Sequence, residues 1–190
     1  VFDAGVIYES AMHARDPHGI LKEIFKLFIK KGGKFVQENI KSLKQISNNE
    51  TIINSESKEY KFEKTVIASG AFSKNLTDQL GEKIPLDTER GYHVHFKKKD
   101  HLISRPVIFL DRGFGMTPMN QGLRAVGTVE LGGLKNPPSK KRIDYIIKCA
   151  KELLPDLDKH DDEWLGFRPT LPDFLPILGP SLKNKNIVYA

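Results

Sequence analysis

One stretch of the sequence combines the residue types of a buried strand with those of a tight turn. Residues 65–73 (TVIASGAFS) open with apolar, partly β-branched side chains and break at Gly70. This pattern predicts a strand, a turn and then the start of a helix. The backbone N–H groups at a helix start suit an anion such as a nucleotide phosphate, and a glycine lets a flat or charged ligand approach closely. Taken alone, however, the stretch is better explained as a turn without a ligand.

A second candidate for chemistry is Arg168, which stands in the proline-rich passage 164–173 (WLGFRPTLPD). An arginine is a planar, permanently charged, two-pronged donor that suits a carboxylate. From composition alone, a surface or structural ion-pair arginine is the simpler interpretation. We find no obvious nucleophile–base pair and no catalytic carboxylate pair, so no catalytic residue is assigned. The single cysteine, Cys149, excludes an internal disulfide and a cysteine-rich metal site, and no metal is expected.

Composition narrows the class of protein. The chain has 190 residues, enough for one large or two small domains, with 39% hydrophobic and 28% charged residues. No apolar run is long enough to span a bilayer and no signal peptide is seen, so we expect a cytoplasmic protein. The net charge of +6 raises the question of whether the protein binds nucleic acid. Because the basic residues are spread among acids without a nucleic-acid-binding motif, nucleic acid is not an expected partner.

The elements that must position these residues follow from periodicity. Helical spacing predicts one amphipathic helix from Asp16-Pro17 to Gly32-Gly33, another over 139–154 and a short one over 73–80. Tyr92, Val94 and Phe96 alternate with polar residues, which predicts a half-exposed strand over 89–96. Further strands are expected over residues 1–8, 34–36, 40–46, 51–54, 60–68, 106–110, 114–118, 123–126, 128–131 and from 187, with 40–46 and 51–54 forming a hairpin around 48–49.

This order predicts an α/β (α+β) fold with two parts. Residues 16–83 and 161–190 would form one half, an α/β layer. Residues 1–15 and 84–160 would form the other, an antiparallel sheet with a covering helix.

Four stretches in this order resemble the FAD-dependent D-amino acid oxidase superfamily. Residues 65–73 resemble its "VVxAAGAWS" strand and turn, and residues 85–93 (PLDTERGYH) look like the "PLxTERGYH" of its bacterial D-amino acid dehydrogenase branch. Residues 166–173 (GFRPTLPD) and 175–180 (LPILGP) resemble its "GxRPxxPDxxPxxG" signature. The helix between Asp16-Pro17 and the paired glycines matches the helix before the family's adenine-side strand.

The resemblance implies an enzyme that oxidises a D-amino acid to an imino acid, which water hydrolyses to a 2-oxo acid and ammonia, with FAD as hydride acceptor. It also implies that the first half is a partial FAD-binding domain and the second a substrate-binding domain. The family's N-terminal Gly-x-Gly-x-x-Gly and C-terminal glycine-rich segment are missing from the sequence. We therefore expect an internal fragment that by itself neither holds FAD nor turns over.

Six residues carry the expected site by resemblance. Arg168 would bind the substrate carboxylate, and Tyr92 and His93 would lie on the substrate side. Strand alternation sends Tyr92 and His93 to opposite faces, so at most one of them is expected to face the flavin. Gly70, Ala71 and Ile40 would contact FAD through their backbone. Ordinary structural explanations also exist. His93 could be a sheet-surface residue, Ile40 a core residue of its strand, and Gly70 a turn glycine without a ligand.

Two other readings remain open. One is a flavin oxidase of glycine, sarcosine or another secondary amine, and the other is a non-catalytic binding module for an acidic partner. The run 89–93 (ERGYH) favours the D-amino acid enzyme over the first of these. The side-chain preference of the substrate, the electron acceptor, the oligomeric state and any peripheral membrane association of the parent protein stay open.

Overall fold

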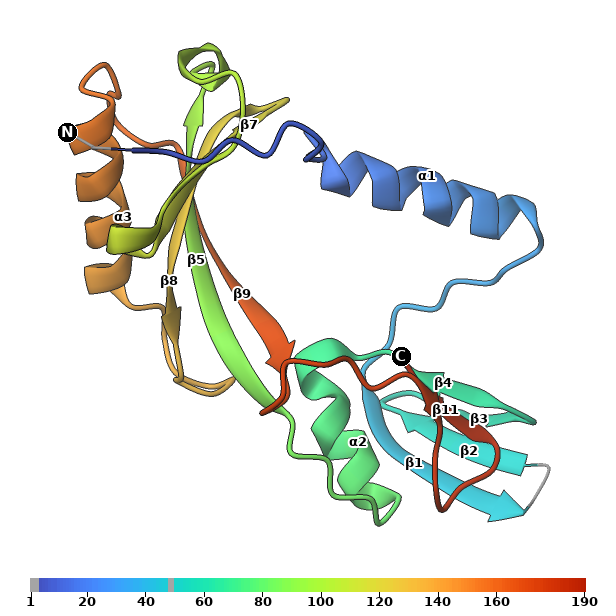
Figure 1. Cartoon of the computed structure of the whole chain (residues 1–190). Coiled ribbons are helices and arrows are strands. Elements are labelled where there is room, and N and C mark those ends of the chain that lie inside the picture. Colours follow the sequence, from blue (N-terminus) through green and yellow to red (C-terminus); the bar gives the residue numbers. More distant parts are fainter. Residues whose placement is uncertain (1–3, 48–49) are drawn as a thin grey trace. The chain divides into compact units, whose positions relative to one another are not determined.

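The computed structural model describes residues 4–47 and 50–190 (Figure 1). Its α-helices are α1 (Pro17–Lys30), α2 (Ser73–Gln79) and α3 (Lys140–Leu153), with single 3-10 turns at Gly70–Phe72, Asp100–Leu102 and Leu110–Arg112. Its strands are β1 (Ile40–Ser47), β2 (Glu50–Ser55), β3 (Glu59–Phe62), β4 (Thr65–Ile67), β5 (Asp87–Lys97), β6 (Val107–Phe109), β7 (Phe114–Met119), β8 (Gly122–Glu130), β9 (Asp162–Thr170), β10 (Gly179–Pro180) and β11 (Ile187–Tyr189). The mixed α/β fold with antiparallel sheets is confirmed.

The chain divides into two compact units, which we describe separately. Unit 1 comprises the described chain up to residue 33 together with residues 93–128 and 140–164; unit 2 comprises residues 34–92, 129–139 and 165–190. Strands β5, β8 and β9 contribute residues to both. These units place residues 16–33, 84–92, 129–139 and 161–164 differently from the halves expected from the sequence. The functional division into FAD-binding and substrate-binding domains stays a prediction.

Unit 2 contains a three-stranded antiparallel meander, β1-β2-β3. The predicted hairpin is confirmed, with Leu43 opposite Ile53, while its turn at residues 48–49 lies outside the described residues. The single strand predicted over 60–68 is wrong, because β3 and β4 belong to different sheets. Glu63 and Lys64, two adjacent charged residues, separate the two strands.

The second sheet of unit 2 has the order β10-β11-β4. Strand β11 runs parallel to β4, with Ile187 opposite Thr65 and Tyr189 opposite Ile67. The predicted strand from residue 187 is therefore confirmed. Its side chains enter a core that holds Leu43, Ile67, Leu80, Ile187 and Tyr189. Burying Ile187 completely contributes about 1.5–3 kcal/mol to this core.

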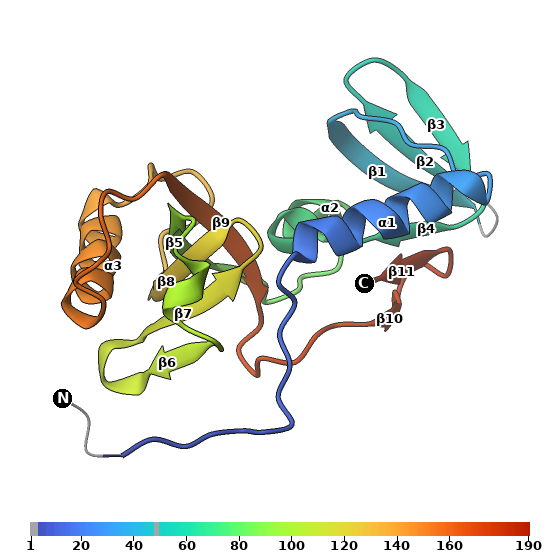
Figure 2. The same ribbon diagram turned by 90° about the horizontal axis from the view of Figure 1, so that it is seen from above.

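The largest sheet has the strand order β6-β7-β8-β5-β9. Strands β6, β7 and β8 pair antiparallel, and the two strands expected over 123–126 and 128–131 are one continuous strand, β8. In unit 1, helix α3 packs along this sheet (Figure 2). Spacing by three and four residues brings one apolar stripe of α3 against the strands. That stripe consists of Ile143, Ile146, Cys149 and Ala150, all buried.

Two predictions on the large sheet are corrected. Strand β5 is not half-exposed, since Tyr92 and Val94 are 0% exposed and the polar Arg90 and His95 are buried as well. Strand β9 was missed because Pro169 argues against a strand. Proline lacks the N–H that a central strand needs, but β9 is the last strand in the sheet order, and an edge position tolerates it.

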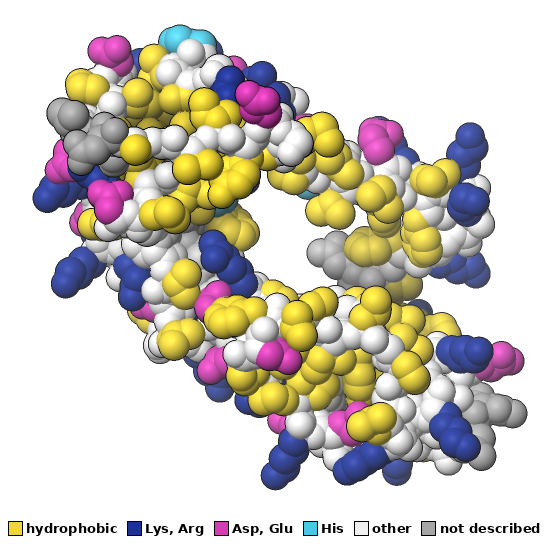
Figure 3. All heavy atoms as spheres, viewed as in Figure 1, with side chains coloured by type: hydrophobic (Ala, Val, Ile, Leu, Met, Phe, Trp, Pro, Cys, Tyr) yellow, Lys and Arg dark blue, Asp and Glu magenta, His cyan; other side chains and the backbone are white. Residues whose placement is uncertain are grey.

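Helix α1 begins and ends where the sequence predicts. The Asp16 carboxylate accepts a hydrogen bond from the Gly19 N–H at 2.8 Å, and Pro17 takes the first helical position. No residue of α1 is buried, and hydrophobic side chains stand along its surface (Figure 3). The strands predicted over 1–8 and 34–36 are wrong for the described residues 4–8 and 34–36, which have no ladder partner; residues 1–3 lie outside the described chain.

Candidate functional site

The turn after β4 has an unusual backbone at Gly70. Its φ of +55° lies in the left-handed region that favours glycine, and a Cβ built there would have no heavy atom within 4 Å. A 3-10 turn, Gly70–Phe72, separates β4 from α2. The Phe72 N–H donates to the Ser69 carbonyl at 3.1 Å, and the Ser73 N–H donates to the Gly70 carbonyl. These two N–H groups are thus already used, so the turn offers a close backbone approach rather than an open helix terminus.

A hollow of about 290 Å³ lies at this end of the small sheet in unit 2. Ile67 and Tyr189, the paired last residues of the parallel strands β4 and β11, lie in its wall beside Gly70. Ligands of α/β proteins bind outside the carboxyl ends of parallel strands. The remaining wall is largely apolar and is formed by Ser73, Thr77, Ile84, Leu86, residues 169–171, residues 174–177 and Ala190. A flat, apolar part of a ligand suits such a wall.

The three residues assigned to FAD by resemblance all belong to unit 2. Gly70 fits a closely approaching group, because the space that a side chain would fill is open. Ala71 follows it and is buried, at 8% exposure. Ile40 begins β1 and is 44% exposed. Of the three, Gly70 lines the hollow, whereas Ala71 and Ile40 are not among its lining residues, so their contact with FAD stays a prediction.

Arg168 lies on β9 with its side chain exposed. Its guanidinium lies directly against the backbone of Gly91 on β5. The Nε and one terminal nitrogen are each 3.0 Å from the point where a Cβ of residue 91 would stand. Within residues 4–47 and 50–190, no acidic side chain pairs with this guanidinium. Its N–H donors are available to a carboxylate from outside the chain.

Tyr92 follows Gly91 and therefore projects from the opposite face of β5. Its hydroxyl donates a short hydrogen bond to Glu130 and accepts one from the Ser139 N–H at 3.1 Å. Burial, reinforced by the Glu130 carboxylate, raises the pKa of Tyr92. Tyr92 thus projects from the face of β5 opposite to the one that Arg168 contacts, and its hydroxyl is engaged within the protein. Its position on the substrate side stays a prediction.

His93, in unit 1, lies in a stack of aromatic rings. Its ring centroid is 4.8 Å from that of Trp164 and 5.1 Å from that of His95. Burial, with a further contribution from the Arg124 charge, lowers the pKa of His93 to about 4. Arg124 Nε donates to His95 Nε2 at 2.8 Å, so that nitrogen acts as an acceptor and the His95 ring is neutral. His93 is therefore a neutral, stacked imidazole at physiological pH.

Arg90 belongs to a network that the sequence did not reveal. Glu89 and Asp87, the acidic residues next to it in the sequence, would be its simplest partners. Instead, a terminal nitrogen donates to the backbone carbonyls of Asn136 and Pro137, each at 2.9 Å, and Nε lies 3.3 Å from a Glu130 oxygen. The ERGYH run therefore contains a buried structural arginine, a glycine under Arg168 and a buried tyrosine. In the sequence, the small Gly91 stands between the large Arg90 and Tyr92, and this contrast in size was the signal that could have pointed to it.

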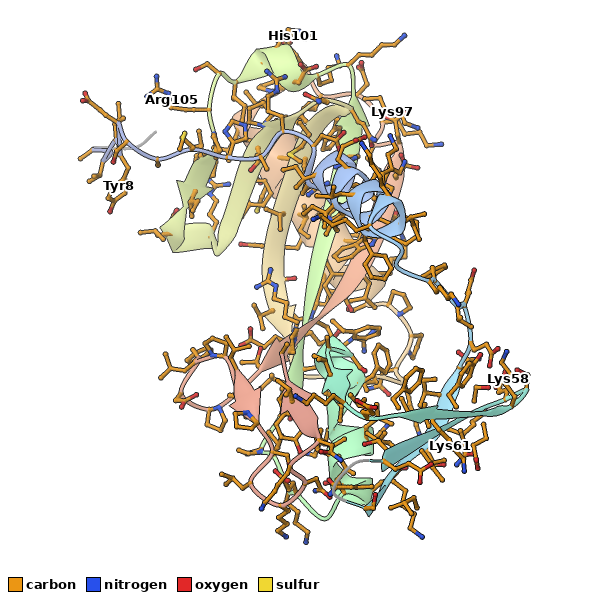
Figure 4. All side chains as sticks on the ribbon, turned by 90° about the vertical axis from the view of Figure 1, so that its right-hand side faces the viewer. Tyr8, Lys58, Lys61, Lys97, His101 and Arg105 are labelled. Carbon is orange, nitrogen blue, oxygen red and sulfur yellow. The ribbon has the colours of Figure 1, made fainter. Side chains whose placement is uncertain are left out.

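Several lysines at the surface of the described chain are paired with acidic side chains. Lys58 and Lys61 lie on the meander of unit 2, and Lys97 lies at the end of β5 (Figure 4). Lys61 pairs with Glu50 at 3.5 Å, and Lys97 pairs with Asp162 at 3.2 Å. In the part of the chain that the structure describes, no helix has the length and apolar character needed to cross a membrane.

Comparison with known proteins matches the whole chain to one family. The sequence pattern of the family described as FAD dependent oxidoreductase matches residues 1–190. A "D-amino-acid oxidase" of Bradyrhizobium diazoefficiens is 32% identical over 100% of this chain and 46% of its own length. A "D-amino acid dehydrogenase" of Paramagnetospirillum magneticum is 29% identical over 95% of this chain and 44% of its own length. The chain thus spans less than half the length of these curated relatives.

The fold also has a match among solved structures. A glycine oxidase from Geobacillus kaustophilus superposes with a TM-score of 0.74 over 84% of this chain and 44% of that chain, at 21% identity. At this identity the likeness shows the fold alone. The mixed α/β architecture with antiparallel sheets is therefore shared with a solved structure, of which this chain covers less than half.

Proposed function

This chain belongs to the family of FAD-dependent oxidoreductases, and from that premise we propose that the whole protein oxidises D-amino acids to 2-oxo acids and ammonia. Two relatives named for D-amino acids, 32% and 29% identical, support this substrate class. The run 85–93 supports the same class, since it resembles the dehydrogenase branch. We assign no electron acceptor.

The observation that carries the proposal is the position of Arg168. Its exposed guanidinium lies flat on the backbone of Gly91 and has no acidic partner among the described residues. It therefore presents paired N–H donors. The carboxylate of an amino acid accepts two parallel hydrogen bonds from such a fork. This contact fixes the carboxylate and thereby orients the α-carbon.

The cofactor half of the proposal rests on Gly70, Ala71 and Ile40, which would hold FAD through backbone contacts. FAD supplies the acceptor for the hydride that leaves the substrate α-carbon. The chain's own residues need only bind and orient the substrate, so the absence of an obvious catalytic base in the sequence is consistent with this chemistry. The imino acid formed by the oxidation is then hydrolysed by water.

A glycine- or sarcosine-type amine oxidase is the second candidate. A "Glycine oxidase" of Pseudomonas putida, 30% identical over 62% of this chain and 33% of its own length, favours keeping it. Both candidates use a carboxylate contact, so Arg168 does not discriminate between them. They differ in whether the enzyme accepts a side chain on the α-carbon.

The test is steady-state kinetics of the full-length protein on a panel of D-amino acids, glycine and sarcosine. We expect turnover of D-amino acids that carry a side chain. In Arg168→Ala the specificity constant should fall roughly 10- to 100-fold, which corresponds to the free energy of one charged hydrogen bond or somewhat more. Arg168→Lys should recover only part of the loss, because an ammonium cannot form the two-pronged contact.

Arg105→Ala, which removes another exposed arginine, is the matched control and should leave the specificity constant unchanged. Flavin absorbance is measured on every variant, and its absence from the full-length protein would favour the non-catalytic binding module. If Arg168→Ala stays within about twofold of the parent, the arginine does not bind substrate. We further expect the 190-residue chain expressed alone to purify without FAD, since its sequence has no glycine-rich pyrophosphate turn.

A further inference from the structure

Gly91 lies directly beneath the proposed substrate arginine. A Cβ at this position would stand 3.0 Å from Arg168 Nε and 3.0 Å from a terminal nitrogen, and 3.2 Å from the carbon that joins them. These three atoms define the plane of the guanidinium. We infer that Gly91 is a positioning residue for Arg168, and that its missing side chain sets the plane in which the two N–H donors face the substrate carboxylate. This inference rests on the proposed function of Arg168.

The strand cannot retreat to make room for a side chain at residue 91. Its neighbours Arg90 and Tyr92 are both 0% exposed and project from the other face of β5. Arg90 is held by the carbonyls of residues 136 and 137, and the Tyr92 hydroxyl is held by Glu130 and the Ser139 N–H. Two anchored side chains therefore fix the height of the Gly91 backbone within the sheet.

The guanidinium, in contrast, can move. Arg168 is exposed, and the atoms that would collide are the far end of a flexible side chain. Gly91 also lies outside the left-handed backbone region, so alanine can adopt its conformation without strain. A methyl group here should displace the Arg168 fork by a few tenths of an ångström while leaving the fold intact.

Displacement of the fork has a defined chemical consequence. A two-pronged contact requires both N–H groups to point at both carboxylate oxygens, and a tilted guanidinium keeps only one good hydrogen bond. The variant should therefore bind the carboxylate more weakly while cofactor contacts at Gly70 remain unchanged. This outcome differs from that of a merely structural glycine, whose replacement would change stability instead.

The first test is made on Gly91→Ala in the full-length protein. We expect KM for a D-amino acid to rise about tenfold, the value of one lost charged hydrogen bond, with kcat reduced less and with flavin content and Tm unchanged. In an Arg168→Ala background the same glycine substitution should have no further effect, because nothing remains to be displaced.

The second test does not depend on turnover, and its first measurement is made on the parent protein. In full-length protein labelled with ¹⁵N-arginine, the Arg168 Nε–H should show a nuclear Overhauser contact to the Gly91 α-protons. Its resonance should shift on titration with acetate, used as a carboxylate without an amine. Gly91→Ala should weaken the acetate-induced shift. The Arg168 resonance is assigned by its loss in Arg168→Lys.

The outcomes separate the two claims. An unchanged KM in Gly91→Ala, together with an impaired Arg168→Ala, overturns the role of Gly91 and leaves the proposed function standing. Absence of the Overhauser contact in the parent protein also overturns that role, even if Gly91→Ala fails to fold. An unimpaired Arg168→Ala overturns the proposed substrate contact, and the inference about Gly91 falls with it.

Discussion

Two arginines of unit 2 flank the same glycine and have opposite surroundings. Arg90 is fully buried and directs its guanidinium to two backbone carbonyls and to Glu130. Arg168 is exposed and, among the described residues, has no acidic partner. Burial removes the water that would solvate a charge, so the buried guanidinium must be paired within the protein. The exposed one keeps its donors for a ligand.

The comparison shows that residue type alone does not assign a role. Both arginines stand in motifs that resemble the same family. The position of the acceptors decides between them, and only the folded chain brings these acceptors into reach. Substitutions at each site should therefore affect different properties of the protein.

The largest expected effect is on stability at Arg90. Arg90→Ala should lower the free energy of unfolding by about 3–5 kcal/mol, because it leaves the Glu130 carboxylate and two backbone carbonyls without the guanidinium. Urea denaturation followed by circular dichroism measures this loss. Should Arg90→Ala cost less than Arg168→Ala under the same conditions, the contrast between the two arginines would be wrong.

A smaller effect is expected at Tyr92, which shares Glu130 with Arg90. Tyr92→Phe removes a hydroxyl that bonds to Glu130 and to the Ser139 N–H, and should cost about 1–3 kcal/mol. The raised pKa of Tyr92 adds a pH dependence. Since the folded protein releases this proton at higher pH than the unfolded chain, whose pKa is 10.0, the contribution is complete below pH 10 and is lost as pH rises above it.

The measurement for Tyr92 is the difference between parent and Tyr92→Phe in denaturation curves from pH 8 upward. The parent should lose more stability than the variant above pH 10. Because Tyr145 and Tyr189 also have raised pKa values and are present in both proteins, their contributions cancel in the difference. Parallel curves across this range would show that the Tyr92 network does not contribute.

The smallest expected effect is on stability at Arg168. Arg168→Ala should change the free energy of unfolding by no more than about 0.5 kcal/mol, as is usual for an exposed side chain without partners. The same urea denaturation measures it alongside Arg90→Ala. A loss above 2 kcal/mol would mean that Arg168 stabilises the sheet, and its proposed role as a free donor would have to be abandoned.

Local signals in the sequence were sufficient for the helices and the hairpin. Asp16 and Pro17 act within one turn of α1, and the apolar stripe of α3 repeats within a few residues, so neither depends on the rest of the chain. The predicted strand over 34–36 was wrong because a strand needs a partner, which its own residues cannot specify. For the same reason, β9 was missed: its edge position, which tolerates Pro169, is a property of the whole sheet.

The candidate site shows the same division. The pattern of residues 65–73 predicted the turn at Gly70, and the motif around Arg168 indicated that residue as a candidate for substrate binding. The sequence did not show that the Tyr92 hydroxyl is engaged by Glu130, or that Arg90 finds carbonyls at residues 136 and 137. These partners lie far along the chain, and a short motif carries no information about them.

The parallel pairing of β4 with β11 has a consequence for biosynthesis. The β1-β2-β3 meander can form soon after its residues leave the ribosome, because its strands are consecutive. Strand β4, however, cannot form its pairing until β11 has been synthesised, because Thr65 pairs with Ile187. At about 5–20 residues per second, roughly 6–25 s pass between the synthesis of the two strands. Throughout that interval the nascent chain carries β4 as an unpaired β-branched edge, the kind of surface on which other chains aggregate.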